Sequence, residues 1–336
     1  MILESDFDEE LRNSVKAGTE RMKEILKIVE DYKNKNDQIK VLKKTLIDLT
    51  PDNIKNVELD PGVSLRVVEI NTKNSSMPIK VNIYSPNSEY KNLPCIYHIH
   101  GGGMIVGSVE YGKLEMSKLV KDFGIVVVDV EYRLAPEYPY PNGINDCYDG
   151  LQWVADHADD LGIDANRIGL MGESAGGGLA ASLALMARDR GGPKLIFQCL
   201  IAPMLNDRNN TESSLMCSGP WPSWPRELNE LGWYALLGEI AGKDGVSYYA
   251  SASRASNLSN LPEAYVEVGG QEVFRDEDID YAHMLMKHGI PVEIHVYPGA
   301  YHSWYGVVPD AKVSKMALLN RTEWMKRRLK LKTIEQ

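Results

Sequence analysis

The spacing of apolar residues predicts helices at the start of the chain. Apolar side chains recur at i, i+3, i+4 and i+7 within residues 22–29, and the same pattern repeats within residues 39–49. Each stretch therefore predicts a helix with a single apolar face. Because an apolar face is unfavourable in contact with water, we expect both helices to pack this face against another part of the protein.

From about residue 60 the pattern changes to short apolar runs that alternate with helical stretches. Two β-rich segments, 65–70 and 79–84, come first and are expected to pair antiparallel. The strand-like runs that follow are 95–99, 125–130, 168–171, 195–201, 264–268 and 292–297. The helix-like segments between and after them are 111–122, 143–157, 176–189, 276–288 and 310–330. Apolar strands alternating with helices indicate an α/β fold, with a mostly parallel central sheet and helices on both faces.

Residues 204–260 interrupt this alternation. The segment is too long for a simple connection, so we expect it to carry structure or function of its own. It contains the aromatic, proline-rich stretch 219–225 (GPWPSWP) and then Trp233 and Tyr234. We therefore predict an N-terminal helical segment at 1–50, one α/β core in two parts at 51–203 and 261–336, and an insertion at 204–260.

Composition and charge argue against several kinds of partner and location for this protein. The chain has 336 residues, a formal charge of −10 and a pI near 5.3, which argues against a nucleic-acid partner and against binding to anionic membranes. No apolar run is long enough to span a bilayer, and the first ten residues are acidic, unlike an export signal. We therefore predict a cytoplasmic protein whose four cysteines (Cys95, Cys147, Cys199 and Cys217) are reduced thiols.

A nucleophilic serine is the strongest chemical signal. Ser174 is the centre of a G-x-S-x-G sequence that follows an apolar strand-like run and precedes a helix-like one. This strand–turn–helix context is what gives the motif meaning, because a tight turn needs flanking glycines and the helix N-terminus favours developing negative charge. We predict that Ser174 is the nucleophile.

A glycine-rich loop supplies candidate donors for an oxyanion. His100 and three glycines follow directly after the strand-like run 95–99. Acyl transfer passes through a tetrahedral oxyanion that needs preorganised N–H donors. We assign this oxyanion hole to the backbone N–H groups of Gly102, Gly103 and Ala175.

The base and the orienting acid are expected after the serine in the chain. His302 lies in a loop just past the last strand-like run, whereas the other histidines precede Ser174 or lie on helix-like or strand-like segments, so we choose His302 as the base. The acid should follow the run 264–268. We favour Glu272 over Asp276, which belongs to the acidic first turn of a helix, and place Glu267 third.

The chain also resembles a known family. The motifs that carry the resemblance, in chain order, are His100-Gly-Gly-Gly, Tyr132-Arg-Leu-Ala-Pro-Glu, Gly172-Glu-Ser-Ala-Gly, Phe274-Arg-Asp-Glu and Tyr297-Pro-Gly-Ala-Tyr-His. Between about residues 80 and 320 the chain looks like the hormone-sensitive-lipase-type branch of the α/β-hydrolase esterases. The resemblance implies an α/β-hydrolase fold, a helical cap from the N-terminal helices and part of 204–250, and no metal or organic cofactor.

Two positions depart from the family pattern. Glu272 stands where the family most often has Asp, and Ser303 and Trp304 follow His302 where Gly and then Phe are usual. A carboxylate of either length can orient an imidazole, so we expect activity to be retained. We expect Trp304 to narrow the floor of the substrate pocket, and Trp221, Trp224 and Trp233 to lie near that pocket.

These observations predict a serine carboxylesterase that hydrolyses small esters of short acyl chain through an acyl-enzyme, with a Ser174–His302–Glu272 triad. Alternatives are hydrolysis of amides, lactones or carbamates, and a non-catalytic protein of the same fold that binds a small ligand. A metal-dependent amidohydrolase, suggested by His98 and His100, leaves Gly172–Gly176 unexplained. The physiological ester and the oligomeric state stay open, although similar proteins frequently form homodimers.

Overall fold

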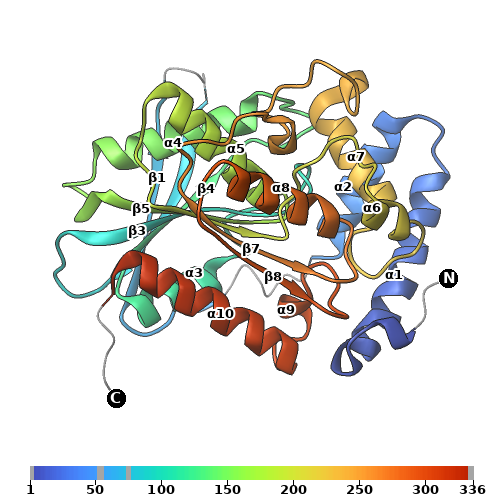
Figure 1. Ribbon diagram of the computed structural model, residues 1–336, viewed down its shortest axis with the longest axis horizontal. Coiled ribbons are helices and arrows are strands. Elements are labelled where there is room, and N and C mark those ends of the chain that lie inside the picture. Colours follow the sequence, from blue (N-terminus) through green and yellow to red (C-terminus); the bar gives the residue numbers. More distant parts are fainter. Residues whose placement is uncertain (1–3, 51–56, 73–76, 332–336) are drawn as a thin grey trace.

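One eight-stranded sheet crosses the molecule, and helices cover both of its faces (Figure 1). The computed structural model describes residues 4–50, 57–72 and 77–331. The strands are β1 (Val63–Ile70), β2 (Ile79–Pro86), β3 (Leu93–Ile99), β4 (Val126–Glu131), β5 (Ile163–Glu173), β6 (Phe197–Ile201), β7 (Glu263–Gly269) and β8 (Val292–Tyr297). Their order across the sheet is β1-β2-β4-β3-β5-β6-β7-β8.

Each predicted helical segment holds a helix, but the first helix begins at Arg12, ten residues before the apolar pattern at 22–29, and the helices at Glu212–Met216, Arg226–Leu237 and Trp304–Val307 lie outside the predicted segments. They are α1 (Arg12–Glu30), α2 (Lys35–Asp48), α3 (Lys113–Phe123), α4 (Asn142–Asp156), α5 (Ala175–Arg190), α6 (Glu212–Met216), α7 (Arg226–Leu237), α8 (Arg275–Lys287), α9 (Trp304–Val307) and α10 (Lys312–Leu329). In the described residues, none of the helices has both the length and the apolar character that crossing a bilayer requires.

The sheet is mostly parallel, as the sequence predicts. β1 pairs antiparallel with β2, and β2 pairs antiparallel with β4. The pairs from β4 through β3, β5, β6 and β7 to β8 are parallel. Among the strands, the largest difference from prediction is β5, which begins five residues before the predicted run because residues 164–167 hold three polar residues and one alanine and so carry no strong apolar signal.

Two apolar layers hold the helices to the sheet. Cys95, Tyr97 and Ile99 of β3 pack on one face, in the cluster that also holds the buried residues of α4, α5 and α8. Ile96, the alternate residue, packs on the other face with those of α3 and α10. Helix α5 is buried at almost every position, which its run of small Ala and Gly residues permits because they allow neighbouring elements to approach closely.

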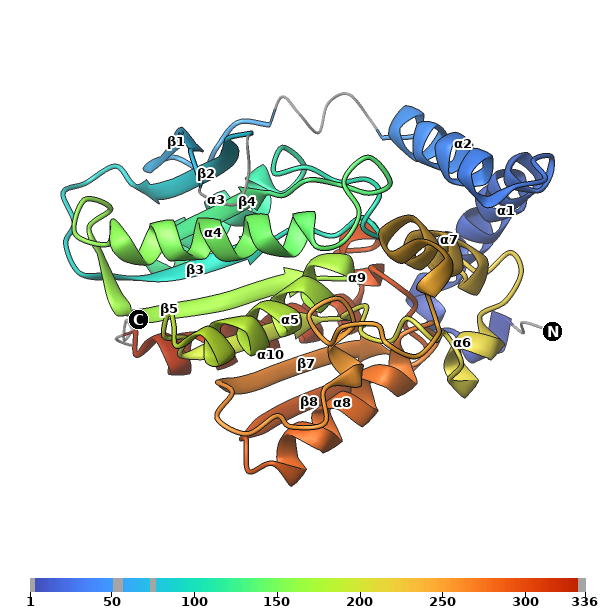
Figure 2. The same cartoon turned by 90° about the horizontal axis from the view of Figure 1, so that it is seen from above.

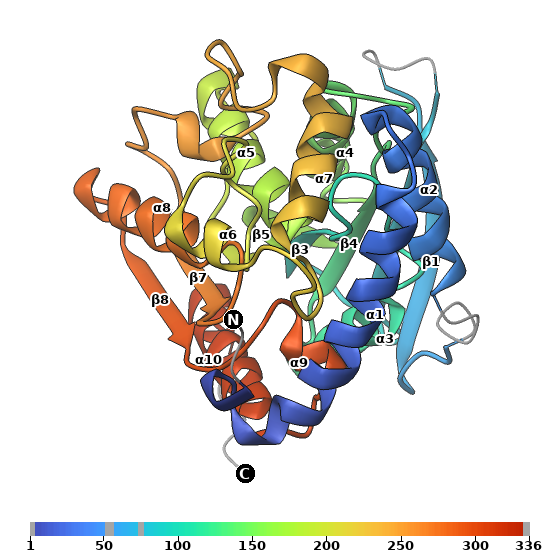
Figure 3. The same ribbon diagram turned by 90° about the vertical axis from the view of Figure 1, so that its right-hand side faces the viewer.

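Helices α1, α2, α6 and α7, here called the outer helices, lie together at the end of the sheet toward which the parallel strands point (Figures 2 and 3). The apolar face of α1 is buried, so the predicted helix pair does cover another part of the protein. The predicted division into core, insertion and N-terminal segment stays a prediction, and its boundary at residue 51 adjoins residues 51–56, which lie outside the described residues.

Candidate active site

Ser174 stands on a sharp turn between β5 and α5. Its backbone has φ of 53° and ψ of −122°, a strained conformation for a residue with a side chain. A Cβ atom at Gly172 would lie 2.3 Å from the carbonyl oxygen of Gly176, and one at Gly176 would lie 2.0 Å from that of Ile99. Close packing therefore excludes a side chain on either side of the serine, which is the physical basis of the G-x-S-x-G spacing.

Three side chains form a hydrogen-bonded row at this turn. His302 Nε2 lies 3.0 Å from Ser174 Oγ, and the Nδ1 of the same ring is in close hydrogen-bonding contact with Glu272 Oε1. All three side chains are buried, and Glu272 is completely so. The residues follow β5, β8 and β7, so parallel strands bring them to one edge of the sheet. This arrangement can pass a proton from a hydroxyl to an imidazole that a carboxylate orients.

The other two candidate acids have different partners. Asp276 accepts hydrogen bonds from the backbone N–H of Ser213 (2.7 Å) and from Arg275 Nε (2.8 Å). Glu267 accepts from the Tyr265 hydroxyl (2.8 Å) and from Arg321 Nη2 (2.6 Å). Of the three acids considered, only Glu272 contacts His302.

The glycine loop after β3 presents free backbone donors. Gly102 and Gly103 have φ of 121° and 59°, values that favour glycine, and the Gly102 carbonyl accepts from Ile105 and Val106. Ala175 is the first residue of α5, where N–H groups have no partner within the helix. Within the described part of the chain, none of the N–H groups of Gly102, Gly103 and Ala175 donates a hydrogen bond.

A family model for the α/β hydrolase fold matches residues 96–306, which hold Ser174, Glu272 and His302. The chain belongs to the α/β-hydrolase fold family. The match begins inside β3, just before the glycine loop, and ends in α9, just after the histidine loop.

Several known relatives of this α/β hydrolase are named as esterases. Esterase LipI of Mycobacterium tuberculosis is 36% identical over 253 residues, which cover 74% of this chain and 78% of that protein. The arylesterase of Saccharolobus solfataricus is 33% identical over 254 residues, 75% of this chain and 80% of that protein. The solved structure of a bacterial heroin esterase superposes with a TM-score of 0.82 at 35% identity, over 87% of this chain and 92% of that one. The resemblance to hormone-sensitive-lipase-type esterases is confirmed.

The four tryptophans predicted to line the pocket have different neighbours. The Trp224 ring lies against Gly103, and Trp221 Nε1 donates to the carbonyl of Gln271 (3.0 Å). Trp233 lines a surface pocket of about 320 Å³ beside α2 and α7. Trp304 is fully buried between the rings of Tyr297 and Tyr305.

His98 and His100, weighed above as a metal-binding pair, also have separate partners. His98 Nδ1 lies 2.9 Å from Asp129 Oδ1; burial disfavours the charged ring, but this carboxylate outweighs it and raises the pKa of His98 to about 8. His100 donates from Nδ1 to the Gly101 carbonyl and stacks on Tyr132. Among the described residues, no group of three or more His, Cys, Asp or Glu side chains is placed to share a metal ion.

A buried ionic network below the serine was missed by sequence reasoning. Glu173 accepts from the Tyr305 hydroxyl, the Arg321 guanidinium lies 4.7 Å from the Tyr305 ring centroid, and Arg321 Nη2 donates to Glu267. Burial works against the charge of Arg321, but Glu267 outweighs it and keeps the pKa of the guanidinium above its ordinary value. The available signal was helical spacing, because Arg321 falls on the apolar stripe of α10 with Ala317 and Trp324.

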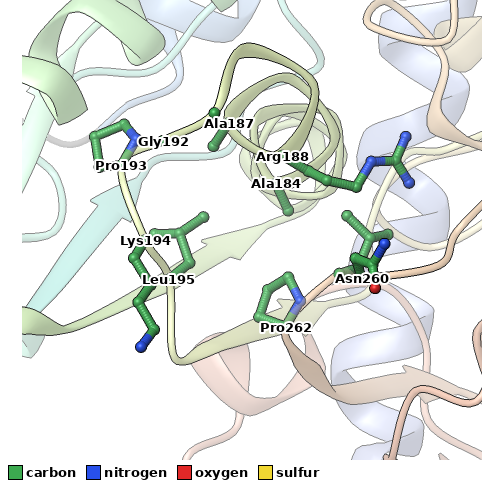
Figure 4. A pocket seen from close by; sticks show the side chains of 11 residues that line it. Ala184, Ala187, Arg188, Gly192, Pro193, Lys194, Leu195, Asn260 and Pro262 are labelled. Carbon is green, nitrogen blue, oxygen red and sulfur yellow. The ribbon is translucent and has the colours of Figure 1, made fainter.

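A further surface pocket, at the C-terminal end of α5, lies far from the triad. It has a volume of about 350 Å³ and is lined by Arg188, Lys194 and Pro262 among others (Figure 4). These residues surround the C-terminal end of α5, whereas Ser174 precedes its first residue. Because α5 has 16 residues, the two ends are separated by roughly 24 Å.

Proposed function

We propose that this α/β hydrolase is a serine carboxylesterase that hydrolyses small carboxylic esters of short acyl chain. The observation that carries the proposal is the row formed by Ser174 Oγ, His302 and Glu272, with 3.0 Å between the serine oxygen and His302 Nε2. The class of enzyme, a carboxylic ester hydrolase, rests on the family and on its esterase relatives.

In the proposed mechanism Ser174 Oγ attacks the acyl carbon while His302 Nε2 takes its proton. The tetrahedral oxyanion accepts hydrogen bonds from the N–H groups of Gly102, Gly103 and Ala175. Collapse expels the alcohol, which receives the proton from His302, and leaves an acyl-serine. Water then attacks this ester with His302 again as base, which releases the acid and restores the serine.

Glu272 is proposed to hold His302 in the tautomer with its proton on Nδ1. The contact with Glu272 Oε1 lies at the ring nitrogen opposite the serine, which is where an orienting carboxylate acts. Oε2 of the same carboxylate is buried and has no hydrogen-bond partner among the described residues. The interaction with His302 is therefore the main one available to this charge, and it also stabilises the imidazolium that forms during attack.

The outer helices and the segment 204–260 are proposed to form a cap over the site. Bulky rings, above all Trp224 beside Gly103, leave little room next to the oxyanion loop, which supports a preference for short acyl chains. Trp221, Trp233 and Trp304 are retained as proposed pocket residues. We further propose a cytoplasmic enzyme that acts on diffusible esters, without nucleic-acid or membrane partners; a homodimer stays a prediction from the resemblance.

The test is hydrolysis of p-nitrophenyl esters from acetate to decanoate by the wild type, Ser174→Ala and His302→Ala. Ser182→Ala is a matched control, because Ser182 is a buried serine on α5 outside the triad. We expect wild-type turnover that is highest for short chains, collapses in the two triad variants and is retained in the control. A maximum at ten carbons would remove the chain-length proposal. No turnover of any ester, with tight binding of a small ligand, would instead indicate a receptor.

A further inference from the structure

The aromatic stretch 219–225, here called the tryptophan loop, connects α6 to α7 and contacts two catalytic loops. Its two tryptophans face different parts of the site. Trp224 touches the glycine loop that holds the candidate oxyanion donors, and Trp221 touches the loop that holds Glu272. A role as pocket walls explains why the two side chains are large. It does not explain why Trp224 contacts the glycine loop and Trp221 contacts the loop of Glu272.

Trp224 lies directly against Gly103. A Cβ atom built on Gly103 would lie 2.3 Å from Cη2 and 2.4 Å from Cζ2 of the Trp224 ring. The indole is itself fixed, because Nε1 donates to Asn229 Oδ1 (3.3 Å) and Asn229 Nδ2 donates to Asn209 Oδ1 (3.0 Å). Asn229 is fully buried on α7, so this side of the ring is held by a rigid element.

Trp221 fixes the residue that precedes Glu272. Its Nε1 donates to the carbonyl of Gln271 over 3.0 Å. The N–H of the same residue donates to the carbonyl of Ala300 (2.8 Å), two residues before His302. The peptide groups on both sides of Gln271 are therefore bonded, one to the histidine loop and one to the tryptophan loop.

The catalytic effect of the Gly103 N–H and of the Glu272 carboxylate depends on where each group points. Gly103 has a positive φ and no side chain of its own to anchor it, so its N–H direction depends on what packs against the loop. Oxyanion donors act only when they point at the developing charge from about 2.7–3.1 Å. The orienting carboxylate likewise acts through the direction it gives to the imidazole.

We propose that the tryptophan loop is a positioning element, in which Trp224 sets the place of the Gly103 N–H and Trp221 sets the place of Glu272. This inference rests on the proposed function and deepens it. The two residues act through Gly103 and Gln271 and need no contact with the substrate. A loop that only walls the pocket would alter which acyl chains fit, whereas a positioning loop alters the rate for the smallest ester as well.

The test compares Trp224→Phe and Trp221→Phe with Trp324→Phe, a matched control buried on α10 against Phe197 and Tyr265. kcat and KM are measured with p-nitrophenyl acetate and hexanoate, and Ki with a short alkyl trifluoromethyl ketone, whose serine adduct carries a tetrahedral oxyanion. Complete loss of one oxyanion donor costs about 100- to 1,000-fold in rate, so we expect Trp224→Phe to lower kcat for acetate roughly tenfold, with little change in KM and a parallel rise in Ki.

For Trp221→Phe we expect a smaller fall in kcat and a displaced pH profile. A loosened carboxylate stabilises the His302 imidazolium less, so the acidic limb of kcat/KM should move to lower pH. If Trp224→Phe fails to fold by circular dichroism, Asn229→Ala, which frees the Trp224 indole but keeps its ring, replaces it in the same assays.

Two results would overturn the inference. One is unchanged kcat for acetate with faster hydrolysis of hexanoate, which would make the loop a pocket wall only. The other is unchanged kcat, Ki and pH profile in an enzyme that Ser174→Ala still inactivates. An inactive wild type would remove the proposed function, and the inference with it, so the two failures are distinguishable.

Discussion

The Tyr305 hydroxyl donates a 2.9 Å hydrogen bond to Glu173 Oε2, and so joins the third residue after His302 to the residue before Ser174. Arg321 stacks on the same tyrosine ring and pairs with Glu267 of β7. Arg321, buried on α10, therefore contacts the tyrosine that connects the loop of the histidine to the turn of the serine.

Arg321→Met should strongly destabilise the fold. The substitution keeps most of the side-chain volume but leaves the buried Glu267 carboxylate without its cation, and breaking a buried ion pair in this way costs about 3–5 kcal/mol. Urea denaturation measures the loss. The double variant Arg321→Met with Glu267→Gln should recover a good part of it, because the fully buried Glu267 charge is removed and only the partly exposed Glu115 is left without Arg321. A single variant as stable as the wild type would contradict the assignment.

Glu272→Gln should lower kcat by about 10³–10⁴-fold, because the amide can favour the wrong imidazole tautomer. Asp276→Asn, in the first turn of α8, is the matched comparison; Asp276 bonds Ser213 and Arg275, so we expect its loss to affect packing more than turnover. Single-turnover kinetics with p-nitrophenyl acetate separates the two. Equal losses, or a larger loss at Asp276, would reject Glu272 as the orienting acid.

Gly232→Ala should impair catalysis although Gly232 lies on α7. A Cβ atom there would come within 2.7 Å of the Gly103 carbonyl oxygen, so either the helix or the glycine loop must shift. We expect kcat for p-nitrophenyl acetate to fall roughly tenfold, a fraction of the cost of a whole oxyanion donor. Gly112→Ala is the control, because its nearest neighbour would lie at an ordinary 3.7 Å. An unchanged kcat would show that α7 and the glycine loop accommodate the methyl group without moving the oxyanion donors.

Asp278→Asn should stabilise the protein, and more so as pH rises. Asp278 is fully buried on α8, and neither of its carboxyl oxygens has a hydrogen-bond partner among the described residues. Burial, with the neighbouring Glu277 and Glu272, raises the pKa of Asp278 well above its ordinary value. The folded state therefore holds a proton that the unfolded state releases above about pH 4, so wild-type stability falls from there toward the folded pKa.

The amide introduced by Asp278→Asn carries no proton that the unfolded state would release, so its folding costs nothing extra at high pH. We therefore expect Asp278→Asn to raise the free energy of unfolding by about 1–3 kcal/mol at pH 8 and by much less at pH 4. Thermal unfolding at the two pH values measures it. Asp280→Asn, an exposed acid on the same helix, is the control and should change little. A gain that does not depend on pH would mean that the carboxyl group is not protonated in the folded protein.

The sequence predicted the sheet and most of its helices, because alternation of apolar strands and helices is a local signal. It also predicted Ser174 and His302 as partners, since both follow strands whose parallel arrangement leads to one edge. Two features depend on distant residues and were not predictable. Arg321 pairs with Glu267, 54 positions earlier, and the tryptophan loop touches loops that start at residues 100 and 270. Local spacing flags an arginine on an apolar stripe, or an aromatic loop, but not its partner.

Helix α10 links the two ends of the molecule. At its start, the backbone N–H of Lys312 donates to Glu10 Oε2 beside the outer helices. The helix ends 17 residues and about 26 Å further on, at the end of the sheet away from those helices (Figure 2). A fusion partner or a solid support attached beyond α10 would therefore leave the outer helices facing the solution. Attachment at the amino end would crowd Asp8, which bonds the histidine loop at Gly299.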